Sequence, residues 1–158
     1  MEKKIFTFIL LIFLSSCGYE AIYSQKNRVN YAFKISELEL SGDRQVNLKV
    51  KQILNSYSNP GIEIEEGKSF ALKISSKSEK IITTKDASGD ATKFKNEIIL
   101  KVQVSMDGTI ISNFSVTEKF IYNNNSNTSE LRSYENQIKN NLTEAAVDKV
   151  TLKLALIK

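Results

Sequence analysis

The central part of the chain alternates between apolar and polar residues over a long stretch. From Phe94 to Met106, apolar side chains occupy almost every second position, and lysine, glutamate or glutamine fills most positions between them. A period of two residues is typical of a β-strand with one covered face and one wet face. Asp107-Gly108 then favours a type I′ hairpin, and the returning run indicates another strand. The residues that predict the buried face of this strand are Ile110, Phe114, Val116 and Phe120.

Two shorter runs earlier in the chain predict two more strands. The first covers Tyr31 to Leu40, and its alternation changes phase near Ser36. The second starts at Phe70, where Phe70, Leu72 and Ile74 alternate with Ala71, Lys73 and Ser75. The sequence therefore predicts four strands in total.

Two segments show helical spacing instead. Ser41-Gly42-Asp43 predicts a turn and an N-cap, and the apolar residues from Val46 to Tyr57 recur every three or four positions. Asn59-Pro60-Gly61 would end this helix. Asn127-Thr128-Ser129-Glu130 resembles a second helix start, and the helical pattern continues from Leu131 to Val150.

The predicted order of elements is β-α-β-β-β-α. Two amphipathic helices and one half-buried sheet favour an α+β fold, a two-layer sandwich with both helices on one face of a four-stranded mixed sheet. The folded domain is expected to cover residues 31–158, preceded by a polar tether over residues 17–30.

One region departs from the pattern of a compact core. From Ser75 to Lys80 both parities are polar, so the second and third strands are expected to extend past the helices as an exposed hairpin. Its far end carries apolar and cationic residues, namely Ile81, Ile82, Phe94, Lys85, Lys93 and Lys95. Such a mixture suits an amphipathic anionic ligand or the wall of a partner protein. An ordinary hairpin with a lysine-rich tip explains it equally well.

The first residues have the form of a secretory signal. Lys3 and Lys4 precede an apolar run from Ile5 to Leu14, which would make about 15 Å of helix and is too short to span a bilayer. Ser15-Ser16-Cys17 follows and resembles the lipobox of bacterial lipoproteins. Residues 1–16 are therefore expected to be removed, and Cys17 to carry an S-diacylglycerol and an N-acyl chain. A secreted protein with a chance cysteine at this position is the alternative.

The predicted anchor also bears on location. Two or three acyl chains hold a protein firmly at a membrane. Gly18 stands where many lipoproteins retained at the inner membrane have aspartate, so the periplasmic face of the outer membrane is expected.

Composition limits the chemistry. The 158 residues include 22 Lys and Arg against 18 Asp and Glu, one cysteine and no histidine. These counts exclude a histidine-based triad, a His/Cys zinc site and an internal disulfide. Serines 69, 75, 76 and 78 lie near lysines in a run where both are common. We expect no enzyme activity, no metal or other cofactor beyond the acyl groups, and no nucleic-acid partner.

Several features together resemble one family. Cys17-Gly18-Tyr19 followed by Ile22-Tyr23 is similar to the mature start of the LPS-assembly lipoproteins LptE, especially alphaproteobacterial ones, although Ala21 replaces a proline common there. The element order, the hairpin tip at Lys85–Gly89 and an asparagine-rich loop before the last helix extend the resemblance over the mature chain.

The resemblance implies a non-enzymatic role. LptE proteins plug and help to assemble the outer-membrane β-barrel LptD, and they assist insertion of lipopolysaccharide into the outer leaflet. Family members bind lipopolysaccharide through basic residues, whose nearest matches here are Lys85 and Arg132. A stand-alone periplasmic lipoprotein that binds a lipid or solute is the main alternative, and a lipoprotein hydrolase with Ser-Lys chemistry is a third.

Overall fold

A computed structural model describes residues 33–58 and 68–157. The signal segment, the tether with Cys17, and Asn59-Pro60-Gly61 lie outside the described residues. The described elements are β1 (Phe33–Gly42), α2 (Arg44–Leu54), a 3-10 turn η2 (Asn55–Tyr57), β2 (Lys68–Lys85), β3 (Ala91–Met106), β4 (Thr109–Asn123) and α3 (Thr128–Ala155).

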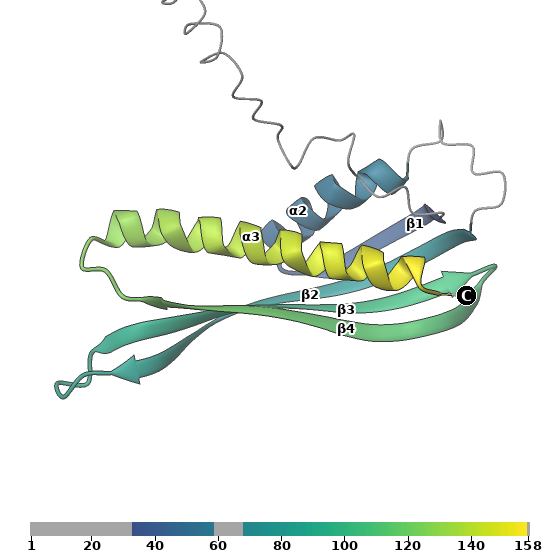
Figure 1. Ribbon diagram of the computed structural model, residues 1–158. Helices are drawn as coiled ribbons and strands as arrows, with labels where there is room; N and C mark the ends of the chain where they lie inside the picture. Colours follow the sequence, from purple (N-terminus) through teal and green to yellow (C-terminus); the bar gives the residue numbers. More distant parts are fainter. Residues whose placement is uncertain (1–32, 59–67, 158) are drawn as a thin grey trace, which may run out of the picture. The chain divides into compact units, whose positions relative to one another are not determined.

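The four strands form one mixed sheet in the order β1-β2-β3-β4. β1 runs parallel to β2 and is connected to it through α2, whereas β2, β3 and β4 form an antiparallel meander. Both helices lie on the same face of this sheet, and α3 follows it over most of its length (Figure 1). The predicted two-layer α+β fold and its element order are confirmed.

The core lies between the helices and this face of the sheet, as the period-two pattern predicts. The fully buried larger side chains are Phe70, Leu54, Leu72, Ile74, Ile98, Leu100, Leu154, Val46, Val50, Val104, Val147 and Val150. Residues of the opposite parity, such as Lys73, Lys101 and Gln103, lie on the outer face. Burial of the apolar parity on one side explains why the sheet register is fixed.

Two irregularities in the strands have opposite outcomes for the sequence predictions. The phase change near Ser36 is confirmed as a break in register between Ile35 and Glu37, which lets apolar residues on both sides of it face the core. A second shift lies beside Val104 and pairs Ile110 with Ser105 of the outer parity. The prediction that Ile110 is buried is therefore wrong, and its side chain is 54% exposed.

The expected burial of Phe120 is also wrong. Phe120 lies opposite the buried Asn96 and so has the inner parity, but it remains 45% exposed. It belongs to the edge strand and lines an open hollow beside α3. Tyr122, two positions later, is buried instead.

Both helices begin with the caps that the sequence predicts. The Asp43 carboxylate accepts the Val46 N–H at the start of α2, and the Asn127 side chain accepts the N–H groups of Ser129 and Glu130 at the start of α3. Helix α3 has 28 residues and so extends for about 42 Å. It therefore reaches along the sheet well beyond α2 (Figure 1).

Candidate functional site

The β2–β3 hairpin extends away from the helices and bends from the plane of the sheet (Figure 1). Every residue from Lys80 to Asp90 is exposed, and side chains become partly buried again from Ala91. The tip is ordered by Asp86, whose carboxylate accepts the N–H groups of Ser88 and Asp90, both at 2.9 Å. Gly89 adopts a φ of 92°, which closes the turn without strain.

Two of the basic residues expected to contact an anionic ligand are exposed on this hairpin. Lys85 and Lys93 are exposed, and neither forms an ion pair with another described residue. Lys95 differs, because its ammonium group lies 2.8 Å from Glu97 and its side chain is only 25% exposed. The hydrogen bond from Lys95 lowers the pKa of Glu97. Lys95 is thus partly neutralised within the protein.

Apolar side chains accompany these lysines on the outer face. Ile81 and Ile121 lie on either side of Lys95, each directly paired with it across the sheet. Ile81 is 38% exposed and Ile121 is 56% exposed. The row therefore presents a cation between two apolar groups, as expected for the mixed surface of this hairpin.

Phe94 does not belong to that exposed surface. It has the inner parity, lies 5.8 Å from the ring of Tyr122, and is covered by the ammonium group of Lys80 at 4.0 Å from its centroid. The prediction that Phe94 is one of the exposed groups at the hairpin tip is therefore wrong. Alternation along β3 puts Phe94 on the helix side, where α3 and β4 give it partners.

A polar cluster that sequence reasoning missed joins the hairpin base to α3. One carboxylate oxygen of Glu135 accepts both the Tyr122 hydroxyl, at 2.8 Å, and the Lys80 ammonium group, at 2.6 Å. Burial and then the contact with Glu135 raise the pKa of Tyr122. No local sequence motif indicates this cluster, because its members come from β2, β4 and α3.

This cluster helps to position Arg132. Arg132 lies one helical turn before Glu135 and so shares its flank of α3. Glu135 forms an ion pair with Lys80 of β2, so the flank of α3 that carries Glu135 and Arg132 faces the base of the β2–β3 hairpin. Arg132 is exposed and forms no ion pair with another described residue. Three exposed cations thus lie on the hairpin and on the adjoining start of α3, namely Lys85, Lys93 and Arg132.

The outer face of the sheet is polar and carries charges of both signs. Glu39 pairs with Lys73 at 3.0 Å, and Lys77 pairs with Glu79. A shallow hollow of about 490 Å³ crosses this face, and the residues that line it are Ser41, Lys73, Ser75, Lys101, Val102, Gln103, Asn113, Phe114 and Ser115. Such a face suits contact with a wet protein wall better than contact with lipid.

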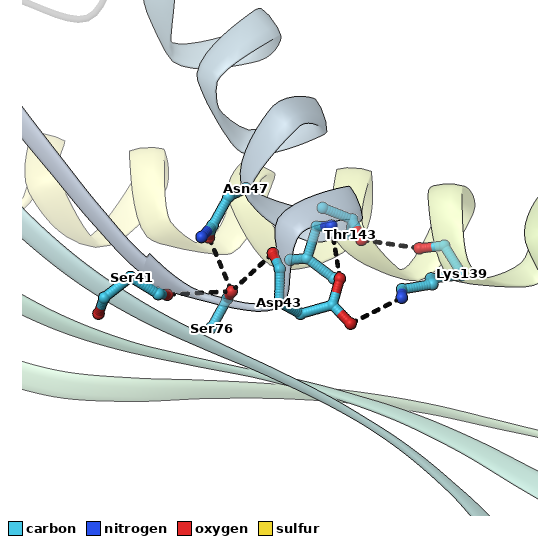
Figure 2. Close-up of polar contacts among 7 residues, drawn as sticks. Ser41, Asp43, Asn47, Ser76, Lys139 and Thr143 are labelled. Atoms are coloured by element: carbon cyan, nitrogen blue, oxygen red, sulfur yellow. Dashed lines mark hydrogen bonds and ion pairs between the residues drawn. The ribbon is translucent and has the colours of Figure 1, made fainter.

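A second polar cluster joins β1, β2, α2 and α3 (Figure 2). The buried Ser76 hydroxyl lies 2.7 Å from the Asn47 side-chain oxygen and 3.3 Å from the carbonyl groups of Ser41 and Asp43. The Lys139 ammonium group lies 2.8 Å from the Asp43 carboxylate. Ser76, one of the serines noted near lysines, therefore serves to connect the elements at this junction.

Asp43 supports a prediction about stability and pH. Burial raises the pKa of Asp43, but the hydrogen bond from Lys139, the N–H groups of Val46 and Gln45 and the Lys139 charge outweigh burial, so its pKa lies below the usual value. The associated stability is present above the usual aspartate pKa and is lost as pH falls through the lower, folded-state pKa. Asp43→Ala should lower the free energy of unfolding by about 1–2 kcal/mol at neutral pH, measured by urea denaturation.

Asp43→Asn separates the two contributions of this residue. Asparagine is also a good N-cap, so only the charged contact with Lys139 is lost. The stability difference between wild type and Asp43→Asn should therefore shrink below about pH 4. A difference that is constant from pH 7 to pH 3 would show that the Asp43 charge has no role in stability.

No helix within residues 33–58 and 68–157 is long and apolar enough to cross a membrane. No protein-family model matches the chain, and no curated protein matches it either.

Solved structures do match. Rare lipoprotein B from Shewanella oneidensis superposes with a TM-score of 0.55 at 16% identity, over 75% of this chain and 93% of that one. An uncharacterized lipoprotein B from Nitrosomonas europaea gives 0.57 at 10% identity, over 78% and 83%. A minor lipoprotein from Acinetobacter baumannii gives 0.54 at 11% identity, over 81% and 93%. The chain shares the fold of these lipoproteins, which is the LptE-like fold that the sequence resemblance implies.

Proposed function

We propose that this protein is a lipoprotein of the outer membrane, anchored at its periplasmic face through Cys17, that plugs and helps to assemble an LptD-type β-barrel and assists insertion of lipopolysaccharide into the outer leaflet. It acts by binding and by occupying space, without catalysis. The observation that carries the proposal is the fold match to lipoprotein B structures over 93% of the Shewanella chain.

The polar sheet face supports the plugging role. The lumen of an outer-membrane barrel is wet and polar, unlike its lipid-facing wall. The outer face of β1, β2 and β3 carries both lysine and glutamate side chains, and several of these form ion pairs with one another, namely Lys73–Glu39, Lys77–Glu79 and Lys95–Glu97. Such a face can exchange internal ion pairs for contacts with a polar wall without burying an unpaired charge.

The hairpin and the start of α3 support the binding of lipopolysaccharide. Lipid A combines phosphates with acyl chains, so it requires cations beside apolar surface. Lys85, Lys93 and Arg132 are exposed, and Ile81 and Ile82 on the hairpin are 38% and 49% exposed. We assign Lys85 and Arg132 as the main phosphate contacts, Lys93 as a supporting one, and Lys95 as the weakest because Glu97 holds it.

Gentle detergent extraction from the native membrane tests the barrel partnership. The tagged full-length protein should co-purify with a large β-barrel in about a 1:1 ratio. Recovery of the protein alone from intact outer membranes would contradict the proposal.

Charge reversal tests the ligand site. The double variant Lys85→Glu, Arg132→Glu should weaken lipopolysaccharide binding by about tenfold or more, because two charge-assisted contacts become repulsive. Co-purification with the barrel should be unchanged. Binding is measured by titration of the purified protein with lipopolysaccharide.

The control is Arg44→Glu, Lys51→Glu, which makes the same change in net charge on exposed positions of α2. Equal weakening by both pairs would show that only overall charge matters. The site assignment would then fail while the barrel partnership stood.

One observation favours the alternative, a stand-alone lipid-binding lipoprotein. A mostly apolar hollow of about 240 Å³ lies between β4 and α3, lined by Phe120, Tyr134, Gln137, Ile138, Asn141 and Leu142. Saturable binding of a small lipid by a monomer without a barrel partner would favour this function.

A further inference from the structure

Strand β4 forms one edge of the sheet. It pairs with β3 along its length, and within the described residues no strand lies on its other side. An antiparallel edge strand presents alternate N–H and C=O groups outward, spaced to receive another strand. The 15 residues of β4 make this a long template.

The opposite edge, β1, is protected in ways that β4 is not. β1 has only ten residues and carries exposed acidic side chains at Glu37 and Glu39, whereas each of the two edge strands has one irregularity of register, near Ser36 in β1 and at Ile111 in β4. Short length, bulges and charges are the usual means by which proteins prevent pairing at a sheet edge. The two edges of this sheet therefore differ in their capacity to accept a strand.

The first part of β4 has an unusual composition for this chain. Residues 109–117 contain no charged residue, no proline and no glycine, although charged residues make up 25% of the whole sequence. Isoleucine, valine, threonine and phenylalanine supply most of the run. Such uncharged segments with high β-propensity pair readily with identical segments. Glu118 and Lys119 end the run.

Exposed apolar side chains also concentrate on β4. Four of the ten exposed large hydrophobic residues in the described parts of the chain belong to it, and these are Ile110, Ile111, Phe120 and Ile121. Ile110 and Ile111 lie within the uncharged run, and Phe120 and Ile121 follow it. A second strand beside β4 would cover part of each.

We propose that β4 pairs antiparallel with β4 of a second copy of this chain, which joins the two sheets about a two-fold axis. With the axis at Ser115 or Thr117, Glu118 and Lys119 face only uncharged residues of the other copy, so no like charges meet. A two-fold interface uses the same patch twice, and with either axis each charged residue of β4 faces an uncharged residue of the other copy. A foreign strand would need pockets or charges for recognition.

The strength of this contact follows from its size. Beyond the bulge at Ile111, an axis at Ser115 pairs residues 112–118 and an axis at Thr117 pairs residues 112–122. These segments span about 24 to 37 Å of strand, and pairing along them buries less area than a stable dimer needs. The pair is therefore weak and depends on protein concentration. The inference does not rest on the proposed function, because self-pairing and barrel binding are measured separately.

Sedimentation equilibrium of the full-length protein in detergent tests the proposal. The wild type should show a concentration-dependent dimer, and Ser115→Lys, Thr117→Lys should raise the dissociation constant at least about tenfold, because like charges then meet across the axis. The control, Ser41→Lys, adds lysine to the exposed outer side of β1 and should leave dimerisation unchanged. A monomer at all concentrations, or a dimer that survives the β4 lysines, would overturn the proposal.

Site-specific cross-linking gives a second measure that needs no charge change. Ser115→Cys and Thr117→Cys are conservative changes at exposed positions. A cysteine on the two-fold axis of an antiparallel pair lies at disulfide distance from the same cysteine of the second chain. One of them should form a dimer on mild oxidation, whereas the parent and Glu37→Cys on β1 should not. Cross-linking only to a different protein, or none at either position, would also overturn self-pairing.

Discussion

Replacement of Gly42 by alanine is expected to destabilise the domain by about 3 kcal/mol or more. Gly42 adopts a φ of 99° at the end of β1, a conformation that side chains disfavour. A Cβ atom there would lie 1.9 Å from the backbone oxygen of Ser76, far inside van der Waals contact. The melting temperature should fall by about 10 °C or more, measured by circular dichroism.

Gly89→Ala is the matched control for this variant. Gly89 has a similar φ of 92°, but a Cβ there meets no atom within 4 Å. Only the conformational penalty remains, so the loss should be about 1 kcal/mol. If the two variants lost equal stability, the close approach of Gly42 to β2 would be wrong.

Replacement of Cys17 by alanine is expected to abolish attachment to the membrane. In the proposed function the Cys17 thiol carries the diacylglycerol, so this variant would lack the acyl chains that anchor the protein. The variant should accumulate as an uncleaved precursor or appear in the periplasmic fraction, as shown by fractionation and immunoblotting.

Ser15→Ala provides the control, because alanine keeps a small residue before the cysteine. If Cys17 is the anchor as proposed, both Ser15→Ala and the wild type should be processed and fractionate with the outer membrane. Continued membrane attachment of Cys17→Ala after a carbonate wash would contradict the assignment of Cys17 as the lipid anchor.

Local signals in the sequence were sufficient for most of the fold. The alternation along β3, the phase change near Ser36 and the cap at Asp43 each depend on neighbouring residues in the chain, and each prediction is confirmed. The prediction for Ile110 is wrong because a shift in β-pairing depends on two strands at once. Phe120 kept its predicted face but not its burial, because its place at the sheet edge is a property of the whole sheet.

The candidate site was harder to predict for the same reason. The exposed hairpin followed from polar residues on both parities, and Lys85 and Lys93 are exposed on it. The contacts that decide which groups are available came from distant elements. Glu135 on α3 forms an ion pair with Lys80, which remains exposed, and Lys80 and Tyr122 contact the half-buried ring of Phe94.

The position of α3 after all four strands in the chain has a consequence for biogenesis. Four residues of this helix, Ala146, Val147, Val150 and Leu154, are needed to complete the core, and they are synthesised after all four strands. The three-stranded meander can pair earlier through local hairpins, but its apolar face stays uncovered until the helix arrives. A chain that is exported while still growing would thus stay loose enough for translocation, and would become compact only after α3 had crossed.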